Sequence, residues 1–297
     1  MNGDLPSLYT VLINESERIR ADLNALINQS RVAKRFDNAG GGLVMITARP
    51  FEWEPLPIAA RGLQAHLRES YRHFSALVRA VLAAETESTH DELTEVENDV
   101  LRILNQDGSI EYDTAANAGR LAADALSRQV AYVEHLWSSN SDPILVPDTN
   151  ALIFNPALED WTFADPLRRF RMAITPTVLA ELDLLKTRDV VRQKAERLIR
   201  QIREYRRRGR LFDGVPLRTG VSTIFSVAAE PLMEKSLPWL DAMNRDDRLI
   251  ASTIEIARRN IRAIVAIVTR DANVENKADF AGLPCVHPPT AAANQGK

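Results

Sequence analysis

Four acidic residues in the second half of the chain are placed where they could act together. Asp148 follows the apolar run ILVP, and Asp271 follows the apolar run AIVAIVT. Glu181 comes shortly after the run AIT, and Asp247 opens DDRLIASTIEIARR, which leads into AIVAIVT. Carboxylate oxygens are the ligands that Mg²⁺ and Mn²⁺ prefer, and such an ion orients water and neutralises a phosphodiester under attack. The four acids therefore predict a metal site for phosphodiester hydrolysis.

Each acid also has a structural interpretation. Asp148 stands where an Asx turn would form, and Asp247 stands where a helix would start. Without a metal, four clustered carboxylates repel one another, and at least one is pushed toward its protonated form.

Other chemistries find little support in the sequence. The five histidines lie mostly in the N-terminal half, so a Ser-His-Asp or Cys-His arrangement is not indicated. The phosphate-binding patterns GxxxxGK[ST] and GxGxxG are absent from the sequence. Cys285 is the single cysteine, which excludes an internal disulfide and a cysteine-based zinc cluster.

Strands that alternate with helices must bring the four acids together. Four apolar runs are rich in β-branched residues and are separated by helical patterns, namely Ile144–Pro147, Ala173–Thr175, Val221–Val227 and Ala263–Thr269. The alternation predicts an α/β domain with a largely parallel sheet. Because functional sites in open α/β sheets gather at the carboxyl ends of the strands, we expect the acids to converge on one rim.

The sequence pattern of the first half of the chain predicts an all-α region. Apolar residues recur at spacings of three, four and seven in four stretches, about Leu5–Leu26, Leu63–Val81, Leu93–Leu104 and Ala115–Trp137. Between the first two stretches lies NAGGGLVMITARPFEWEPLP, whose apolar run Leu43–Thr47 is either a strand or an extended connection.

The small polar segment Ser138–Pro143 marks a boundary. We expect a helical region at residues 1–142, an α/β domain at 143–287 and a disordered tail at 288–297. Residues 1–142 hold 13 Lys and Arg against 21 Asp and Glu, whereas residues 143–297 hold 24 against 19. This split indicates two units, of which the second would meet an anionic partner.

The sequence predicts a cytoplasmic protein that does not contact a membrane. Its apolar stretches are all shorter than the roughly 18 residues of a membrane-spanning helix. The beginning MNGDLPSLYT lacks the basic start and apolar run of a secretory signal.

Four segments carry a resemblance to a known family. VPDTNALI, ITPTVLAELDLLK, NRDDRLIAS and TRDANVENKA resemble, in order and spacing, the acidic motifs of PIN-domain nucleases. The resemblance covers roughly Ile144–Val286, about half of the chain, and its specificity lies in the ordered series rather than in one motif. It implies a compact three-layer α/β/α domain with a central parallel sheet, Mg²⁺ or Mn²⁺ as cofactor, and cleavage of single-stranded RNA in most members.

The resemblance also implies a role for each matched residue. The residues that would bind metal and carry catalysis are Asp148, Glu181, Asp247 and Asp271. The residues that would support them are Thr149, Asn150, Asp246, Thr269 and Asn273. Asp246 is an alternative to Asp247 as the third acid, and Asp183 is expected on the other side of the helix from Glu181. Because the acidic set is complete, the resemblance favours an active enzyme over a degenerate copy.

A strongly basic helix is expected between the second and third strands. The segment KTRDVVRQKAERLIRQIREYRRRGR contains eleven basic residues against three acidic ones, with Leu198 and Ile202 on an apolar stripe. It either follows a phosphate backbone or forms a solvated surface. The candidates for contact with nucleic acid are Arg192, Arg200, Arg203, Arg206 and Arg207.

The favoured function is a metal-dependent endoribonuclease, with DNA as an alternative substrate. A non-catalytic nucleic-acid-binding module would depend on the basic helix alone. A protein-interaction protein would use the helical half, which is also the candidate surface for self-association or a protein partner. The toxin of a toxin–antitoxin pair is a further alternative, although such toxins are usually little more than a bare PIN domain.

Overall fold

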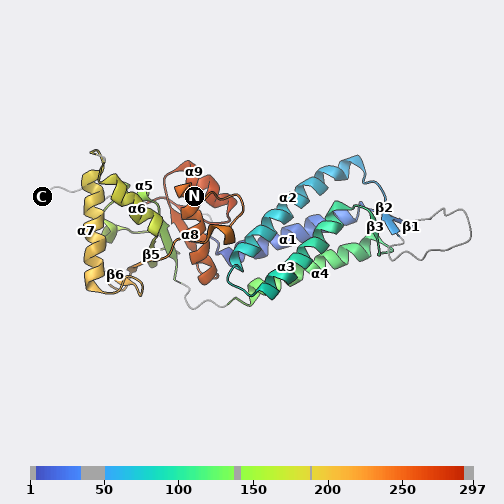
Figure 1. Cartoon of the computed structure of the whole chain (residues 1–297), viewed down its shortest axis with the longest axis horizontal. Coiled ribbons are helices and arrows are strands. Elements are labelled where there is room, and N and C mark those ends of the chain that lie inside the picture. Colours follow the sequence, from blue (N-terminus) through green and yellow to red (C-terminus); the bar gives the residue numbers. More distant parts are fainter. Residues whose placement is uncertain (1–4, 35–50, 137–141, 188, 291–297) are drawn as a thin grey trace, which may run out of the picture. The chain divides into compact units, whose positions relative to one another are not determined.

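The computed structural model describes residues 5–34, 51–136, 142–187 and 189–290 (Figure 1). The chain divides into two compact units, one of residues 12–135 and one that joins residues 1–11 to residues 136–297. The N-terminal segment is part of the second unit because the Tyr9 N–H donates to the Ile261 carbonyl at 3.1 Å. The Arg262 guanidinium also lies over the Tyr9 ring. Within the described ranges, none of the helices combines the length and apolar character needed to cross a membrane.

Long helices form the first unit, as the sequence predicts. They are α1 (Leu8–Ile27), α2 (Ile58–Val81), α3 (Glu87–Asn105) and α4 (Ala115–Glu134) (Figure 1). The predicted apolar faces form the core, in which Leu67, Leu93 and Leu126 are buried. Thr86 and Thr114 cap α3 and α4, since each side chain accepts a hydrogen bond from a backbone N–H in the first turn. The prediction of a helical N-terminal half is confirmed.

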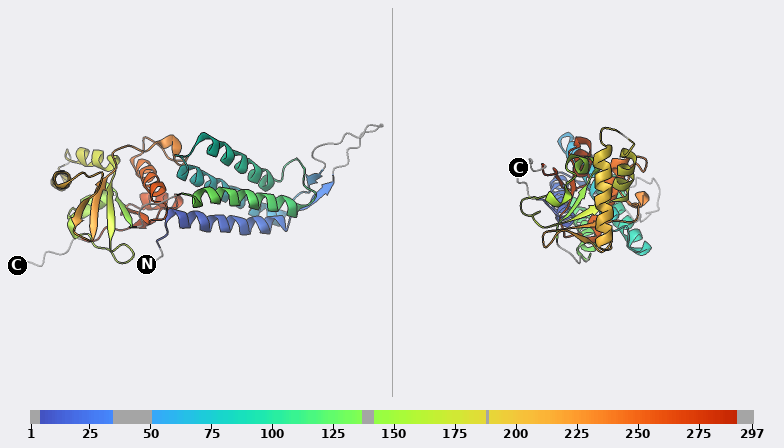
Figure 2. Two further views of the ribbon diagram at one scale, coloured as in Figure 1. Left: turned by 90° about the horizontal axis from the view of Figure 1, so that it is seen from below. Right: turned by 90° about the vertical axis from the view of Figure 1, so that its left-hand side faces the viewer.

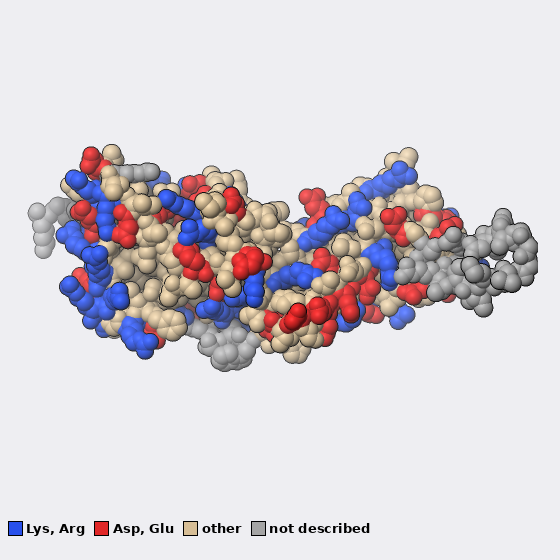
Figure 3. Space-filling view, in the orientation of Figure 1, with Lys and Arg blue, Asp and Glu red and all other residues tan. Residues whose placement is uncertain are grey.

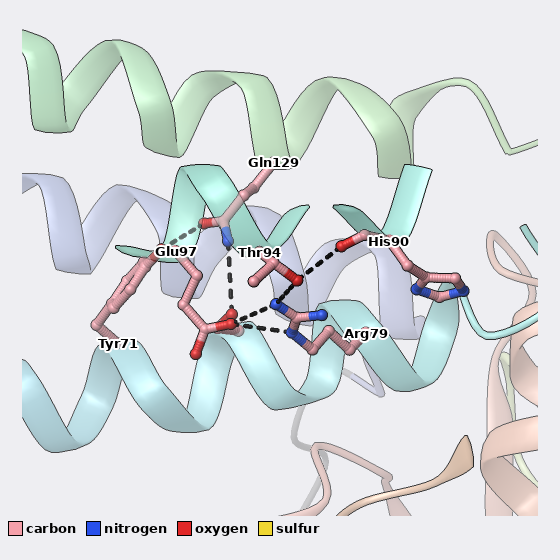
Figure 4. A network of polar contacts seen from close by, with 7 residues as sticks. Tyr71, Arg79, His90, Thr94, Glu97 and Gln129 are labelled. Atoms are coloured by element: carbon pink, nitrogen blue, oxygen red, sulfur yellow. Dashed lines mark hydrogen bonds and ion pairs between the residues drawn. The ribbon is translucent and has the colours of Figure 1, made fainter. Parts of the chain in front are cut away.

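Polar contacts join α2 to both α3 and α4 (Figure 4). The Tyr71 hydroxyl donates to Gln129 Oε1 at 3.1 Å in the core. Burial raises the pKa of Tyr71 well above its usual range, so the phenol remains a neutral donor. The Arg79 guanidinium donates to Glu97 Oε2 at 2.7 Å and to Thr94 Oγ1 at 3.0 Å. These bonds fix the register of α2 against its two neighbours.

A small antiparallel sheet accompanies the helices, so the unit is not all-α as expected. Its order is β1-β2-β3, formed by β1 (Val32–Lys34), β2 (Phe51–Trp53) and β3 (Ser109–Ile110). The strands have only two or three residues, which is too short for an alternating pattern to show in the sequence. The run Leu43–Thr47 and most of Ser138–Pro143 lie outside the described residues.

The second unit contains a six-stranded sheet in the order β6-β7-β5-β4-β8-β9. Figure 2 shows strands of this sheet side by side. Its parallel strands are β4 (Ile144–Pro147), β5 (Phe170–Ile174), β7 (Ser222–Ser226), β8 (Val265–Val268) and β9 (Cys285–Val286). The edge strand β6 (Val215–Arg218) is antiparallel to β7. The sequence pattern did not predict β6, which contains Pro216, or β9, which has two residues.

Helices cover both faces of this sheet. They are α5 (Thr149–Phe154), α6 (Pro176–Leu185), α7 (Arg192–Arg208), α8 (Arg245–Arg259) and α9 (Ala272–Phe280). The connections from β4 to β5 and from β5 to β7 run one way across the sheet, and those to β8 and β9 run the other way. Right-handed crossovers therefore put α5–α7 on one face and α8 and α9 on the other. The predicted three-layer α/β/α fold is confirmed.

The packed domain continues beyond residue 287, its expected end. Pro288 is buried, and the Asn155 side-chain amide donates to the Pro289 carbonyl at 3.0 Å. The first residues of the expected tail are therefore part of the fold, and residues 291–297 lie outside the described ranges.

Candidate active site

The carboxyl ends of β4 and β8 meet at one rim of the sheet, because the two strands pair along their full length. Asp148 follows β4, and its N–H donates to the Val268 carbonyl at 3.0 Å. Asp271 stands three residues after the end of β8. These two acids therefore come from neighbouring strands that are far apart in the sequence.

A threonine hydroxyl connects the two acids. Thr269 is fully buried, donates to Asp148 Oδ2, and accepts the N–H of Asp271 at 2.9 Å. Asp148 also caps α5 by accepting the N–H of Ala151 at 2.5 Å, and Asp271 caps α9. Both acids therefore have a structural role, since each begins a helix at this rim of the sheet.

Replacing Thr269 by valine tests this connection. Valine keeps the shape but leaves Asp148 Oδ2 without its hydroxyl donor and the Asp271 N–H without its acceptor, so we expect the free energy of unfolding to fall by about 1–3 kcal/mol. Thr269→Ser retains the hydroxyl and is the matched control. Urea unfolding measures the difference, and equal stability of the two variants would show that the hydroxyl does not hold the acids.

Asp148 is a buried acid with two acidic neighbours. Its residue is 6% exposed, and burial raises its pKa to about 6. The hydrogen bonds from Thr269 and Ala151 lower the pKa, whereas the charges of Asp271 and Glu181 raise it further. The folded protein therefore disfavours the ionised form of Asp148.

Glu181 reaches the rim from α6. Its Oε2 accepts a hydrogen bond at 2.7 Å from the hydroxyl of Thr149, the residue that follows Asp148. Its Oε1 lies 3.5 Å from Arg245 Nη1, at the start of α8. Sequence reasoning missed Arg245, although it stands two residues before Asp247 in the same motif.

The motifs of Asp148 and Glu181 contain two further polar residues. Asn150, expected to support Asp148, is exposed on α5. Asp183, expected on the other side of α6 from Glu181, forms an ion pair with Lys186.

Asp247 is the most enclosed acid of α8. Its residue is 4% exposed, and Oδ1 accepts a hydrogen bond from Lys277 Nζ at 2.6 Å. Its Oδ2 accepts the N–H of Asp241 at 2.9 Å. Asp247 is thus satisfied by a cation and a backbone donor of the chain itself.

The adjacent Asp246 contacts the neighbouring motif instead. Its Oδ2 accepts a hydrogen bond from the Asn273 side-chain amide at 3.0 Å. The backbone N–H of Asn273 in turn donates to Asp271 Oδ1 at 2.9 Å. Asn273 therefore links Asp246 to Asp271, while Asp247 is paired elsewhere.

Within the described ranges, no three His, Cys, Asp or Glu side chains form a group that could hold a metal ion. The acids instead share the rim in separate hydrogen-bonded sets. Their donor chemistry fits a hard divalent cation, because Asp148, Glu181 and Asp271 supply carboxylate oxygens, the ligands that such ions prefer.

Arg270 adds a cation at this rim that sequence reasoning also missed. It lies between Thr269 and Asp271 and is exposed, with its guanidinium 4.1 Å from the centroid of the Phe154 ring. A guanidinium in this position suits a phosphate oxygen, since arginine donates through a planar fork. Its place inside the TRDANVENKA motif was the signal that could have identified it.

Residues 145–288 match the family model of the PIN domain. The match spans 144 of the 297 residues, just under half of the chain, and includes all four acids. The helical unit lies outside it. Among curated proteins, none matches the chain.

Proposed function

Because the C-terminal part of the chain is a PIN domain, a domain of the nuclease type, we propose that this protein is a metal-dependent endonuclease of single-stranded RNA. The observation that carries the proposal is the rim on which Asp148 and Asp271 are joined through Thr269, while Glu181 is bonded to Thr149, the residue after Asp148. Neighbouring carboxylates repel one another, so this rim suits a divalent cation that would offset their charge.

Asp148, Glu181 and Asp271 would hold Mg²⁺ or Mn²⁺. When bound, such an ion lowers the pKa of a water and neutralises charge on the phosphodiester. Thr269 orients Asp148 and Asp271, and Thr149 orients Glu181. These hydroxyls would keep the carboxylates in the same orientation when a metal ion binds.

Two arginines would bind the substrate. Arg270 is exposed beside Asp271, and Arg245 lies at Glu181 with its side chain half exposed. Each would donate to non-bridging phosphate oxygens on the strand being cleaved. Asp246 or Asp247 would be the third acid of the family motif, and their different surroundings make the choice testable.

Cleavage assays with the full chain test the proposal. We expect single-stranded RNA to be cut with Mn²⁺ or Mg²⁺ and not with EDTA, and a single-stranded DNA of the same sequence to be cut less. A circular single-stranded RNA separates endonuclease from exonuclease activity, because only an endonuclease opens it. Failure to cut either nucleic acid with either metal would contradict the proposal and favour a non-catalytic nucleic-acid-binding domain.

A further inference from the structure

A pocket of about 720 Å³ opens beside the C-terminal half of α7, a volume typical of ligand sites. Apolar side chains from neighbouring elements line it. They are Leu179 of α6, Ile199 and Ile202 of α7, and Leu211 and Phe212 of the turn that follows α7. The pocket is therefore separate from the acids at the ends of β4 and β8, although α6 contributes to both.

Arginines dominate the polar lining of this pocket. They are Arg203, Arg206, Arg207, Arg208 and Arg210. The first three are exposed and form no ion pair with any residue that the structure describes, whereas the last two pair with acids of their own segment. Lys and Arg side chains gather along α7 on the surface (Figure 3). Asp183 also lines the pocket but pairs with Lys186, so the pocket carries an excess of positive charge and suits a polyanion.

An exposed aromatic ring accompanies these cations. Phe212 is 69% exposed, although a side chain of this size is ordinarily buried. Its turn is attached to the sheet, because the Ser226 N–H donates to the Leu211 carbonyl at 3.1 Å. An exposed ring on an anchored turn, next to guanidinium groups, is the kind of surface on which the bases of single-stranded nucleic acids stack.

The pocket opens at the same edge of the sheet as the acids. Ser226 lines the pocket and ends β7, where it pairs with Ile174 at the end of β5. The next strand is β4, which is followed by Asp148. Strand spacing puts the ends of β7 and β4 about 10 Å apart. One short nucleic-acid strand can therefore reach both places.

We propose that this pocket is a second binding site for single-stranded nucleic acid, in which a base stacks on Phe212 and phosphates contact Arg203, Arg206 and Arg207. The proposal rests on the proposed nuclease function, because it extends the substrate from the acids across α6 to α7. It selects single strands, since the base faces of a duplex are already stacked. Of the α7 arginines expected to bind nucleic acid, Arg192 and Arg200 do not line the pocket.

Binding measured in EDTA tests this site without requiring cleavage. The probe is a fluorescein-labelled single-stranded RNA of about 12 nucleotides, followed by fluorescence anisotropy with the full chain. We expect Phe212→Ala to raise the Kd about tenfold without changing its dependence on salt. We expect Arg203→Ala/Arg206→Ala to raise the Kd about tenfold and to reduce the slope of log Kd against log salt by about 1.4.

The double variant Lys194→Ala/Arg197→Ala is the matched control, because it removes the same charge from exposed positions of α7 outside the pocket. It should bind the RNA within about twofold of the parent. A duplex of the same length should bind Phe212→Ala and the parent equally. An equal loss in the control, or no effect of Phe212→Ala on the single strand, overturns the proposal.

Cleavage assays separate this proposal from the nuclease function. If the parent protein does not cleave with metal but the pocket variants bind RNA weakly in EDTA, the binding site stands and only the nuclease function is contradicted. If the parent protein cleaves RNA but the pocket variants bind it as tightly as the parent does, only the proposed binding site is contradicted.

Discussion

Replacing Asp148 by asparagine is expected to abolish cleavage and, in EDTA, to make the protein more stable. The pKa of Asp148 is about 6 in the folded domain against 3.8 for the unfolded reference. A raised folded pKa means that the fold prefers the protonated acid, so ionisation costs stability as pH rises through this interval. Above about pH 7 the cost is about 3 kcal/mol. Asparagine removes the charge and still caps α5.

Urea unfolding in EDTA measures this gain at two pH values. At about pH 7.5 we expect Asp148→Asn to be more stable than the parent, and near pH 4 we expect the difference to disappear. Mn²⁺ should stabilise the parent and not the variant. Asp189→Asn is the control, because that acid is 91% exposed in its side chain and should change neither property. If Asp148→Asn cleaves RNA at the parental rate, or is less stable than the parent in EDTA, Asp148 is not the buried catalytic acid that we propose.

Replacing Lys277 by methionine is expected to have the second large effect, a loss of about 3 kcal/mol of stability in EDTA. Lys277 Nζ lies 2.6 Å from Asp247 Oδ1, and the Asp247 side chain is only 6% exposed. Removing the cation leaves a buried carboxylate with the Asp241 N–H as its remaining donor. An unpaired buried charge costs far more than the intact pair contributes.

A second variant separates charge from packing in this prediction. Lys277→Met/Asp247→Asn removes both charges and should recover most of the stability, because asparagine still accepts the Asp241 N–H. Lys235→Met, at an exposed position, is the control and should be neutral. If Lys277→Met is as stable as the parent, the ion pair does not support the fold.

The same variants decide between the two candidates for the third acid. If Asp247 binds the metal, excess Mn²⁺ supplies the charge that Lys277→Met lacks and closes the difference from the parent. If Asp246 has that role, Mn²⁺ stabilises both proteins equally and the difference persists. The structure favours neither by distance alone, because Asp247 is enclosed and Asp246 is linked to Asp271 through Asn273.

The sequence predicted the strands and acids whose signals are local. Asp148 and Asp271 could be found because each follows an apolar run long enough to identify as a strand. The partners of the acids could not be found, because they depend on which strands and helices become neighbours. Lys277 of α9 binds Asp247, which lies thirty residues earlier on α8. Arg245 of α8 forms an ion pair with Glu181 of α6.

The basic helix shows the same limit. Its arginines were evident from composition, but composition does not distinguish Arg203 and Arg206, which line the pocket, from Arg192 and Arg200, which do not. The distinction depends on the turn after α7, which folds back so that Leu211 bonds to the end of β7. Phe212 gave no signal in the sequence, because its exposure follows from that turn.

The hydrogen bond between Thr269 and Asp148 has a consequence for the newly made chain. It joins residues 121 positions apart, and β8 must pair with β4 before it can form. During synthesis from the N-terminus, Asp148 and Glu181 leave the ribosome well before Thr269 and Asp271. The nascent protein therefore carries an incomplete acid set until β8 and the start of α9 have been made, and the proposed nuclease would become able to cut RNA only after that point.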